Sequence, residues 1–249
     1  MTASLAGVVL LSGGQAVGEE AVLYRETFPN AAGSGQPLST YGWSYHLGTQ
    51  GWDEAGNDAA QGLVNEGVGS GAGLLPVHAG GDTPDAEANH EARGRGFVVN
   101  ALGPDGAGPD DDPYWNQLTH YATTELSIDR STHRVEALGL DLALSQPDDV
   151  RLTVKIGDAW FASQQTFSTS PVDGYEIYSG FAAKAKTLRI DLSDAAWLPM
   201  NFVPGTTMGL DTSQPAEALP DGVLTGLGLL LQPSGFEAFD NVTVFGEPR

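Results

Sequence analysis

The segment Glu237-Ala238-Phe239-Asp240-Asn241-Val242-Thr243-Val244-Phe245 has the pattern of a β-strand, and so has Val22-Leu23-Tyr24-Arg25-Glu26-Thr27-Phe28 near the other end of the chain. Side chains of a strand point alternately to its two faces. In each segment this period places one carboxylate among apolar residues. The shared faces hold Val22, Tyr24, Glu26 and Phe28 in the first segment, and Asp240, Val242 and Val244 in the last.

A carboxylate on a buried face is costly unless a cation or several hydrogen-bond donors compensate it. We therefore expect the two terminal strands to meet and Glu26 and Asp240 to share a hard cation, with Ca²⁺ the best candidate. Calcium takes six to eight oxygen ligands, so backbone carbonyls of the loop 30–35 would have to contribute. The alternative is that one carboxylate pairs with an arginine or points into solvent at the edge of the fold.

The composition narrows the class of protein. The chain has 249 residues, of which 41% are hydrophobic, with 33 glycines and 15 prolines, as expected for many short strands joined by turns. Cysteine is absent, so disulfides and thiolate chemistry are excluded. The formal net charge of −21 argues against nucleic acid and anionic membrane surfaces as partners, because both are bound through Lys and Arg.

The N-terminal residues 1–18 are expected to lie outside the fold. Leu5–Leu11 is a short apolar run, and small residues at 16–18 fit a cleavage site, but no basic residue precedes the run. These features favour a signal peptide, and hence a secreted or cell-surface protein, with a disordered tail as the alternative. The sequence contains no apolar run long enough for a transmembrane helix, so no membrane insertion is expected.

The middle of the chain has strong strand patterns. Apolar residues alternate over 138–144 and 150–156, and the turn 146–149 between them predicts a hairpin. The apolar run Val223–Leu231 is typical of a central strand buried on both faces, and its glycines 226 and 228 indicate close packing against large neighbours. About ten short strands predict an all-β fold, a jelly-roll β-sandwich of two antiparallel sheets.

A single domain over residues 19–249 is expected, with a loop-rich insertion at 53–113. The insertion is rich in glycine and acidic residues and contains only short strand candidates, at 61–65, 73–78 and 96–101. Long irregular segments of this kind tend to be binding loops when they are ordered. Its acidic run 104–113 is interpreted either as a second calcium loop or as a solvated loop, because it lacks the spacing of an EF-hand.

Several short motifs resemble jelly-roll carbohydrate-binding modules of the galactose-binding-like superfamily. They are the early Arg25–Phe28, the Tyr41–Trp43 segment, Asp148–Lys155 leading to Trp160, and the final Phe239–Val244. The resemblance implies a two-sheet jelly roll in which the early Glu and the late Asp, here Glu26 and Asp240, ligate a structural calcium ion. It further implies that aromatic residues hold a polysaccharide or oligosaccharide on a concave face or in edge loops.

A sugar ring packs its C–H face on an aromatic plane while polar side chains bind its hydroxyls. The segment Tyr114-Trp115-Asn116 lies beside the acidic loop with an amide within reach, and Trp52 follows a short turn. The candidate ligand-binding residues are therefore Tyr114, Trp115, Trp52 and Asn116. Trp43 and Trp160 lie inside strands and are more typical of a core.

Three functions stay open at this point. The favoured one is a secreted, calcium-stabilised β-sandwich that binds carbohydrate without catalysis. A polysaccharide lyase or glycoside hydrolase on the same fold is the second, with His120 or His90 near an arginine as the candidate base. The third is a structural or adhesive surface domain. No histidine spacing typical of a metal site and no nucleophile motif is present.

Overall fold

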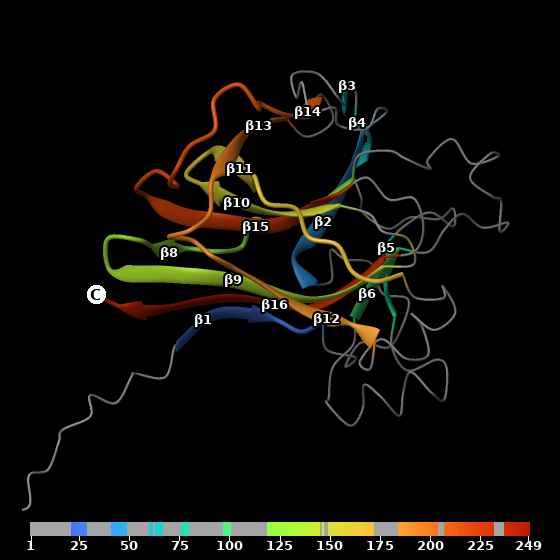
Figure 1. Ribbon diagram of the computed structural model, residues 1–249, viewed down its shortest axis with the longest axis horizontal. Coiled ribbons are helices and arrows are strands. Elements are labelled where there is room, and N and C mark those ends of the chain that lie inside the picture. The colour runs from blue at the N-terminus through green and yellow to red at the C-terminus, as the bar shows by residue number, and fades with distance from the viewer. Residues whose placement is uncertain are drawn as a thin grey trace, which may run out of the picture.

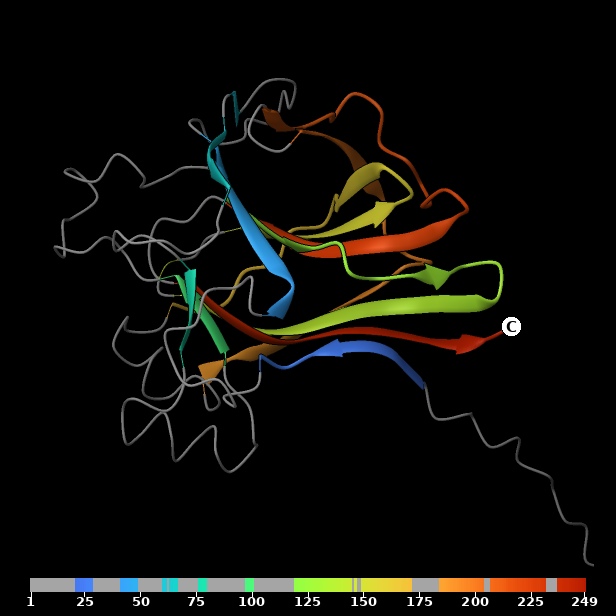
Figure 2. The ribbon, with the colours of Figure 1, turned by 180° about the vertical axis from the view of Figure 1, so that it is seen from behind.

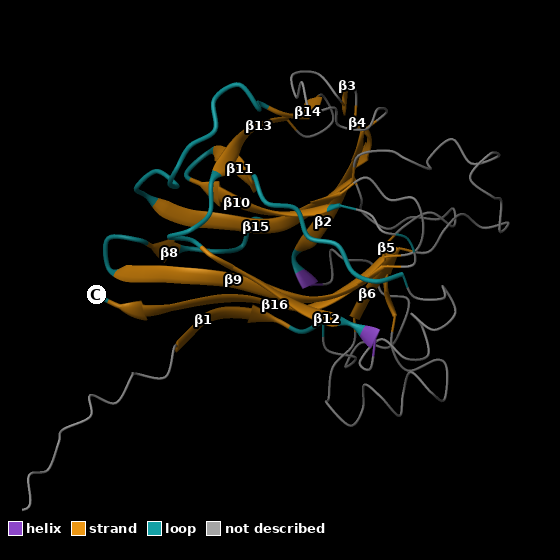
Figure 3. Ribbon diagram, in the orientation of Figure 1, coloured by secondary structure: helices purple, strands orange, loops and turns teal. Residues whose placement is uncertain are grey.

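The computed structural model describes residues 21–28, 41–48, 60–61, 63–66, 76–79, 97–100, 119–144, 146, 149–171, 184–203, 207–231 and 237–249. These residues are built almost entirely of strand and loop (Figure 3). Among them we find no helix with the length and apolar character needed to cross a bilayer. The expected tail at 1–18 and most of the expected insertion lie outside the described residues.

The strands form two sheets, and all their pairings are antiparallel (Figures 1 and 2). A six-stranded sheet has the order β12-β9-β16-β6-β5, with β1 also paired to β16. Its strands are β1 Ala21–Glu26, β5 Pro76–Ala79, β6 Phe97–Asn100, β9 His133–Leu144, β12 Lys186–Asp191 and β16 Glu237–Pro248.

The second sheet has ten strands in the order β3-β14-β13-β11-β10-β15-β7-β2-β4, with β8 paired to β15. Its strands are β2 Trp43–Gly48, β3 Ala60–Gln61, β4 Leu63–Glu66, β7 Thr119–Thr123, β8 Ile128–Asp129, β10 Val150–Ile156, β11 Ala159–Ser163, β13 Trp197–Val203, β14 Thr207–Leu210 and β15 Val223–Leu231.

The chain passes repeatedly from one sheet to the other, as in a jelly roll. β9 lies in the six-stranded sheet, β10 and β11 in the ten-stranded sheet, β12 in the first again, and β16 returns to it after β13–β15. The all-β jelly-roll sandwich expected from the sequence is therefore the observed fold. The predicted hairpin between 138–144 and 150–156 is wrong, because β9 and β10 belong to different sheets. Both strands have an apolar face, and crossing between the sheets packs these faces together.

The core lies between the two sheets and follows the predicted alternation. On β10 the residues Val150, Leu152 and Val154 are buried in it, opposite leucines of β15 in register. Leucines of β9 approach from the other sheet. Burial of each such side chain contributes about 1.5–3 kcal/mol to stability relative to exposure.

The terminal strands lie side by side as predicted. In register, Tyr24 is opposite Val244 and Glu26 is opposite Val242. The expected sharing of a face by Asp240 and Val242 is wrong, because the register of β16 shifts between Asp240 and Thr243. Asn241 has a φ of 54° at this point, which is the left-handed conformation of a bulge residue.

Three strands of the ten-stranded sheet were not anticipated by the sequence patterns, namely β7, β13 and β14. β7 is short and contains polar residues, and β13 contains Pro199 and Asn201, which argue against a strand. Both are nonetheless paired on two sides, β7 with β15 and β2, and β13 with β11 and β14. The three strand candidates within 53–113 correspond to β3–β4, β5 and β6.

Candidate functional site on the curled face of the ten-stranded sheet

The ten-stranded sheet has one face against the core and a second face that points away from the six-stranded sheet. The sheet curls, so that β13 and β14 rise on one side of β10 and β15 and β2 and β4 rise on the other (Figures 1 and 2). We call the side enclosed by this curl the curled face. A second, smaller apolar cluster lies there, made of Ala122, Trp160, Ala162, Leu198, Met200, Met208, Leu210 and Leu230, with Phe202 packed against it.

A buried hydrogen bond between polar side chains lies within this curled face. Nε2 of His120 on β7 is 2.9 Å from Oγ1 of Thr153 on β10, and both side chains are fully buried. The two strands are separated by β15, so the bond passes over Gly228. A Cβ atom at Gly228 would lie 2.8 Å from the Thr153 hydroxyl, 3.0 Å from the His120 ring and 2.2 Å from a backbone oxygen. Glycine is therefore required by the close approach of these neighbours.

Three further rings pack around the His120 ring of this hydrogen bond. Phe202 packs edge-on against both His46 and His120, with centroid distances of 4.9 Å and 4.8 Å. Trp160 packs edge-on against His120 at 4.7 Å. We call His46, His120, Trp160 and Phe202 the histidine–aromatic cluster. Phe202 is its only member in the intermediate burial range, so its ring lies at the boundary with solvent.

The imidazole of His120 is held neutral by its surroundings. Burial, with a smaller contribution from the neighbouring His46, holds the pKa of His120 well below its ordinary value of 6.5. His46 is 3.2 Å from the Ser44 hydroxyl, which in turn donates to the carbonyl of Ala122. The curled face thus has an apolar centre with a few hydroxyl and imidazole groups, and β10 adds the cations Arg151 and Lys155 to the same face.

The enzyme interpretation of the sequence makes His120 a candidate catalytic base. In the structure it is fully buried and bonded to Thr153, which is the behaviour of a structural histidine. His133 lies elsewhere, half-buried at the start of β9, with its Nδ1 3.0 Å from the Thr132 hydroxyl. Of the five tryptophans, Trp43, Trp160 and Trp197 are buried, so the expectation of core positions for Trp43 and Trp160 is confirmed.

The candidate ligand residues Tyr114, Trp115, Trp52 and Asn116 lie outside the described residues. Their positions in the sequence are still informative. Trp115 precedes Thr119, the first residue of β7, by four residues, and Trp52 follows Gly48, the last residue of β2, by four residues. Because β2 and β7 are antiparallel neighbours with Leu47 opposite Thr119, both segments join the sheet at the same end of the strands that carry His46 and His120.

The candidate calcium ligands Glu26 and Asp240 lie at a second place, where β1 ends against β16. Oε1 of Glu26 accepts hydrogen bonds from the backbone N–H groups of Thr27 at 2.9 Å and Phe28 at 2.7 Å. Burial raises the pKa of Glu26, and these two hydrogen bonds oppose the rise. Phe28 has a φ of 41°, so the chain turns sharply after Glu26.

Asp240 is fully buried, and its register partner on β9 is Asp141, which is 9% exposed. Asp141 accepts hydrogen bonds from the Thr187 hydroxyl at 2.6 Å and from the Asn241 amide at 3.4 Å. Two carboxylates thus face each other on the outer side of the six-stranded sheet, whereas Glu26 is opposite the core-facing Val242. The structure brings Glu26 and Asp240 to the same stretch of β16, but on opposite faces of it.

Among the described residues, no group of three or more His, Asp or Glu side chains is arranged to hold a metal ion. Asp240 and Glu26 fit calcium in their chemistry, as buried or half-buried carboxylates. The remaining oxygens of a calcium site would have to come from backbone carbonyls, and the loop 30–35 that was expected to supply them lies outside the described residues.

Comparisons with known proteins give structural similarity only. No family model matches the sequence, and no curated protein matches it. The fold is similar to the family 11 carbohydrate-binding module of the cellulosomal cellulase Lic26A-Cel5E of Clostridium thermocellum, at 13% identity and a TM-score of 0.43, covering 92% of this chain and 95% of that one. A second structure of a family 11 module from that organism, in complex with a β-1,3-1,4-mixed-linked tetrasaccharide, is similar at 11% identity and a TM-score of 0.43, covering 90% of this chain and 96% of that one.

A third structure contains the CBM22-1 and GH10 modules of the C. thermocellum xylanase 10B with xylohexaose. It is similar at 11% identity and a TM-score of 0.33, over 92% of this chain and 28% of that one. At such low identity the similarity concerns the fold, so the site must be argued from the residues of this chain.

Proposed function

We propose that this protein binds a neutral carbohydrate chain along the curled face of the ten-stranded sheet, without catalysis of its own. The observation that carries the proposal is the position of Phe202, an aromatic ring at the solvent boundary of a curled surface with an apolar centre. A sugar ring can pack its C–H face on such a ring, while hydroxyls find partners in nearby polar groups. The net charge of −21 repels polyanions and favours a neutral polymer.

The sequence positions of the candidate aromatics support this assignment. Trp52 and Trp115 are each four residues in sequence from the adjacent ends of β2 and β7, the strands that carry His46 and His120. In our proposal Tyr114, Trp115, Trp52 and Asn116 extend the binding surface at this end. The buried His120–Thr153 pair serves to fix β7 and β10 relative to each other and does not contact the ligand.

The binding test is affinity electrophoresis of the full chain in gels that contain one polysaccharide each. The panel includes mixed-linked β-glucan and xylan, because these match the ligands of the similar solved structures. Retardation in at least one neutral gel, without release of reducing ends or unsaturated sugar, is the expected result. Release of product would favour the lyase or hydrolase alternative, and no retardation in any gel would favour a structural or adhesive domain.

We further propose that calcium stabilises the fold where β1 ends against β16, with Asp240 as a ligand. Glu26, which was expected to share the ion, lies on the opposite face of β16 and is not assigned to the same ion. Asp240 is fully buried opposite a second carboxylate, Asp141, and the free energy of this arrangement is lowered by a cation. Two residues in the left-handed conformation lie close to these acidic residues in sequence, Phe28 near Glu26 and Asn241 next to Asp240. Such backbone conformations persist where the surroundings impose them.

The calcium proposal is tested by thermal melts of the full chain in calcium and in EDTA. We expect a higher Tm in calcium for the wild type and a smaller difference for Asp240→Asn, whereas Glu26→Gln is expected to keep the wild-type difference. Asp141→Asn serves as the comparison variant, because its carboxylate faces Asp240 and is not an assigned ligand. A calcium response that disappears only in Asp141→Asn would contradict the assignment, and so would an equal response in all four proteins.

Secretion is also part of the proposal, because a polysaccharide of this kind is met outside the cell. The apolar run Leu5–Leu11 supports it. Expression of the full chain in a bacterial host and detection of a shortened form in the periplasm or medium would test this point, and retention of the intact chain in the cytoplasm would contradict it.

A further inference from the structure

A pocket of about 560 Å³ lies at an edge of the sandwich, between β9 and β12 of the six-stranded sheet and the loop that leads into β15 of the ten-stranded sheet. β12 pairs with residues 137–142 of β9, so residues 133–136 of β9 have no β12 partner. The pocket lies at this unpaired edge of β9. The pocket is lined by Arg130, Arg134, Val135, Glu136, Arg189, Asp191, Leu192, Ser193, Ala218 and Leu219.

Three arginines line this one pocket in a chain that has 11 cationic and 32 acidic residues. Two of them are held by carboxylates. Arg134 pairs with Glu136 and, at 3.3 Å, with Glu247, and Nε of Arg189 lies 2.9 Å from Oδ1 of Asp191. Arg189 also stacks over the ring of Phe245, 4.9 Å from its centroid. A guanidinium has five N–H donors, so the two ion pairs of Arg134, both made by its Nη2, orient this group and leave donors for a ligand.

Arg130 differs from the other two arginines. Its Nη1 donates to two backbone carbonyls, those of Leu219 at 3.4 Å and of Pro220, which holds the segment 218–220 across the pocket. Burial lowers the pKa of Arg130, Asp221 opposes this change and Arg249 adds to it. A partly desolvated cation held by carbonyl dipoles gains from an anion placed beside it, because charge-assisted hydrogen bonds are about twice as strong as neutral ones.

The rest of the lining is not that of a simple anion site. Val135 and Leu219 are buried and give the pocket an apolar floor. Glu136 and Asp191 provide carboxylate oxygens that can accept hydrogen bonds from hydroxyl groups. The volume lies within the range of about 300–1,000 Å³ typical of small-molecule sites. The pocket therefore matches a molecule with one negative charge, several hydroxyls and an apolar C–H face.

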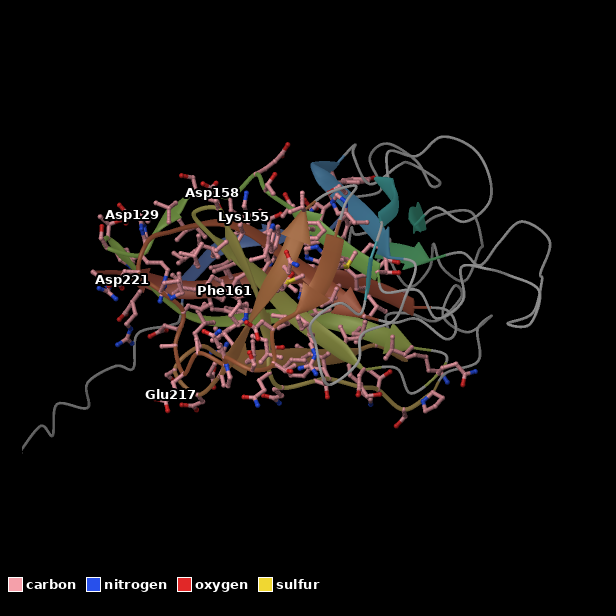
Figure 4. The ribbon with its side chains drawn as sticks, turned by 90° about the horizontal axis from the view of Figure 1, so that it is seen from above. Asp129, Lys155, Asp158, Phe161, Glu217 and Asp221 are labelled. Carbon is pink, nitrogen blue, oxygen red and sulfur yellow. The ribbon has the colours of Figure 1, made fainter. Side chains whose placement is uncertain are left out.

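The surroundings argue against a ligand with many negative charges. The acidic residues Asp129, Glu217 and Asp221 are exposed at this end of the molecule (Figure 4). Together with the net charge of −21 they repel a polyanion, while the arginines attract a single carboxylate at short range.

We propose that this arginine pocket binds a single hexuronic acid residue, such as a side group of an otherwise neutral glycan, with its carboxylate on Arg130 and Arg134. The proposal does not rest on the curled face, because the two sites share no residue. It adds a second contact for a decorated polysaccharide and would select decorated over plain chains.

The test is an NMR titration of the isotope-labelled full chain with methyl glucuronide, and with methyl glucoside as the neutral control that lacks only the carboxylate. We expect saturable shift changes confined to the pocket residues with the glucuronide, and about tenfold weaker binding or none with the glucoside. Sodium acetate provides the carboxylate without the sugar and is expected to bind at least several-fold more weakly than the glucuronide.

Two variants change the pocket in different ways, so that loss of folding cannot be mistaken for loss of the site. Arg134→Gln removes one cation, and Ala218→Glu leaves all three arginines in place but adds a carboxylate to the lining. Both are expected to weaken glucuronide binding about tenfold, whereas Arg25→Gln, an exposed arginine outside the pocket, leaves it unchanged. Equal binding of glucoside and glucuronide, equal binding of acetate, or wild-type binding by both pocket variants would overturn the proposal. These results are independent of retardation by neutral polysaccharides.

Discussion

The two faces of the ten-stranded sheet differ in what their sequence patterns reveal. On the core face Leu152, Val154, Leu227 and Leu229 form a continuous apolar layer against the six-stranded sheet. The curled face of the same strands carries Gly226, Gly228, Thr153 and the histidine–aromatic cluster. The first face follows from apolar burial alone, whereas the second depends on the fit of particular side chains over glycines. The comparison teaches that a face built for contacts other than sheet packing is recognised by the residues that interrupt its apolar pattern, here glycines, a threonine and histidines.

The largest expected loss of stability comes from a substitution on the core face. Leu229→Ala removes a fully buried side chain and leaves a cavity, so we expect the free energy of unfolding to fall by about 2–5 kcal/mol. Urea denaturation monitored by fluorescence measures the change. Val203→Ala is the control, because Val203 is 50% exposed and its truncation is expected to change stability by no more than about 0.5 kcal/mol. Similar losses for both variants would show that the core face is not the main source of stability.

The next largest expected loss of stability comes from adding a methyl group to a closely packed glycine on the curled face. Gly228→Ala places a methyl group 2.2 Å from the backbone oxygen of Tyr121, and we expect a loss of about 1–3 kcal/mol together with a changed environment of the His120 ring. Gly226→Ala is the matched comparison, since its shortest contact would be 2.8 Å and its cost is expected to be smaller. Denaturation curves and histidine NMR spectra measure both. A neutral Gly228→Ala variant would contradict the close packing described here.

A smaller effect concerns pH. Because the pKa of His120 is held well below 6.5 in the folded state by burial, the unfolded chain binds a proton at this residue at a higher pH than the folded one does. The contribution of neutral His120 to the free energy of unfolding is therefore fully present above about pH 6.5. It falls as the pH decreases below this value, by at most about 1.4 kcal/mol per pH unit. Urea denaturation at pH 7.5, 6.5 and 5.5 is the measurement. His120→Gln is expected to show a shallower pH dependence, and an unchanged slope would mean that His120 does not carry the effect.

Much of the fold could be predicted from the sequence. The alternation on β9, β10 and β16 gave an all-β sandwich, and the similarity of the two end segments correctly predicted that β1 and β16 pair. The period-two rule failed at Asp240, because a bulge with Asn241 in the left-handed conformation reverses the faces of β16. A single inserted residue of this kind leaves no mark on the pattern of apolar residues, although an asparagine is a residue type that accepts such a conformation.

The candidate site was less accessible to sequence reasoning. His46, His120, Thr153 and Phe202 come from four strands, and two of these strands, β7 and β13, had no clear pattern. Their proximity depends on strand order, which the sequence does not display. The signal that could have pointed to them is the pair Gly226 and Gly228 in an otherwise apolar strand, which correctly predicted large neighbours but not their identity.

The central claim is that the curled face binds carbohydrate, and two adjacent residues of β13 offer the most direct test. Phe202 packs into the histidine–aromatic cluster at the solvent boundary, whereas Val203 is exposed on the other side of the strand. The measurement is isothermal titration calorimetry of wild type, Phe202→Ala and Val203→Ala with the oligosaccharide of whichever polysaccharide retards the protein. We expect Phe202→Ala to weaken binding by about fivefold or more and Val203→Ala to bind as the wild type does. Equal affinity of all three proteins would place the binding surface elsewhere and contradict the account.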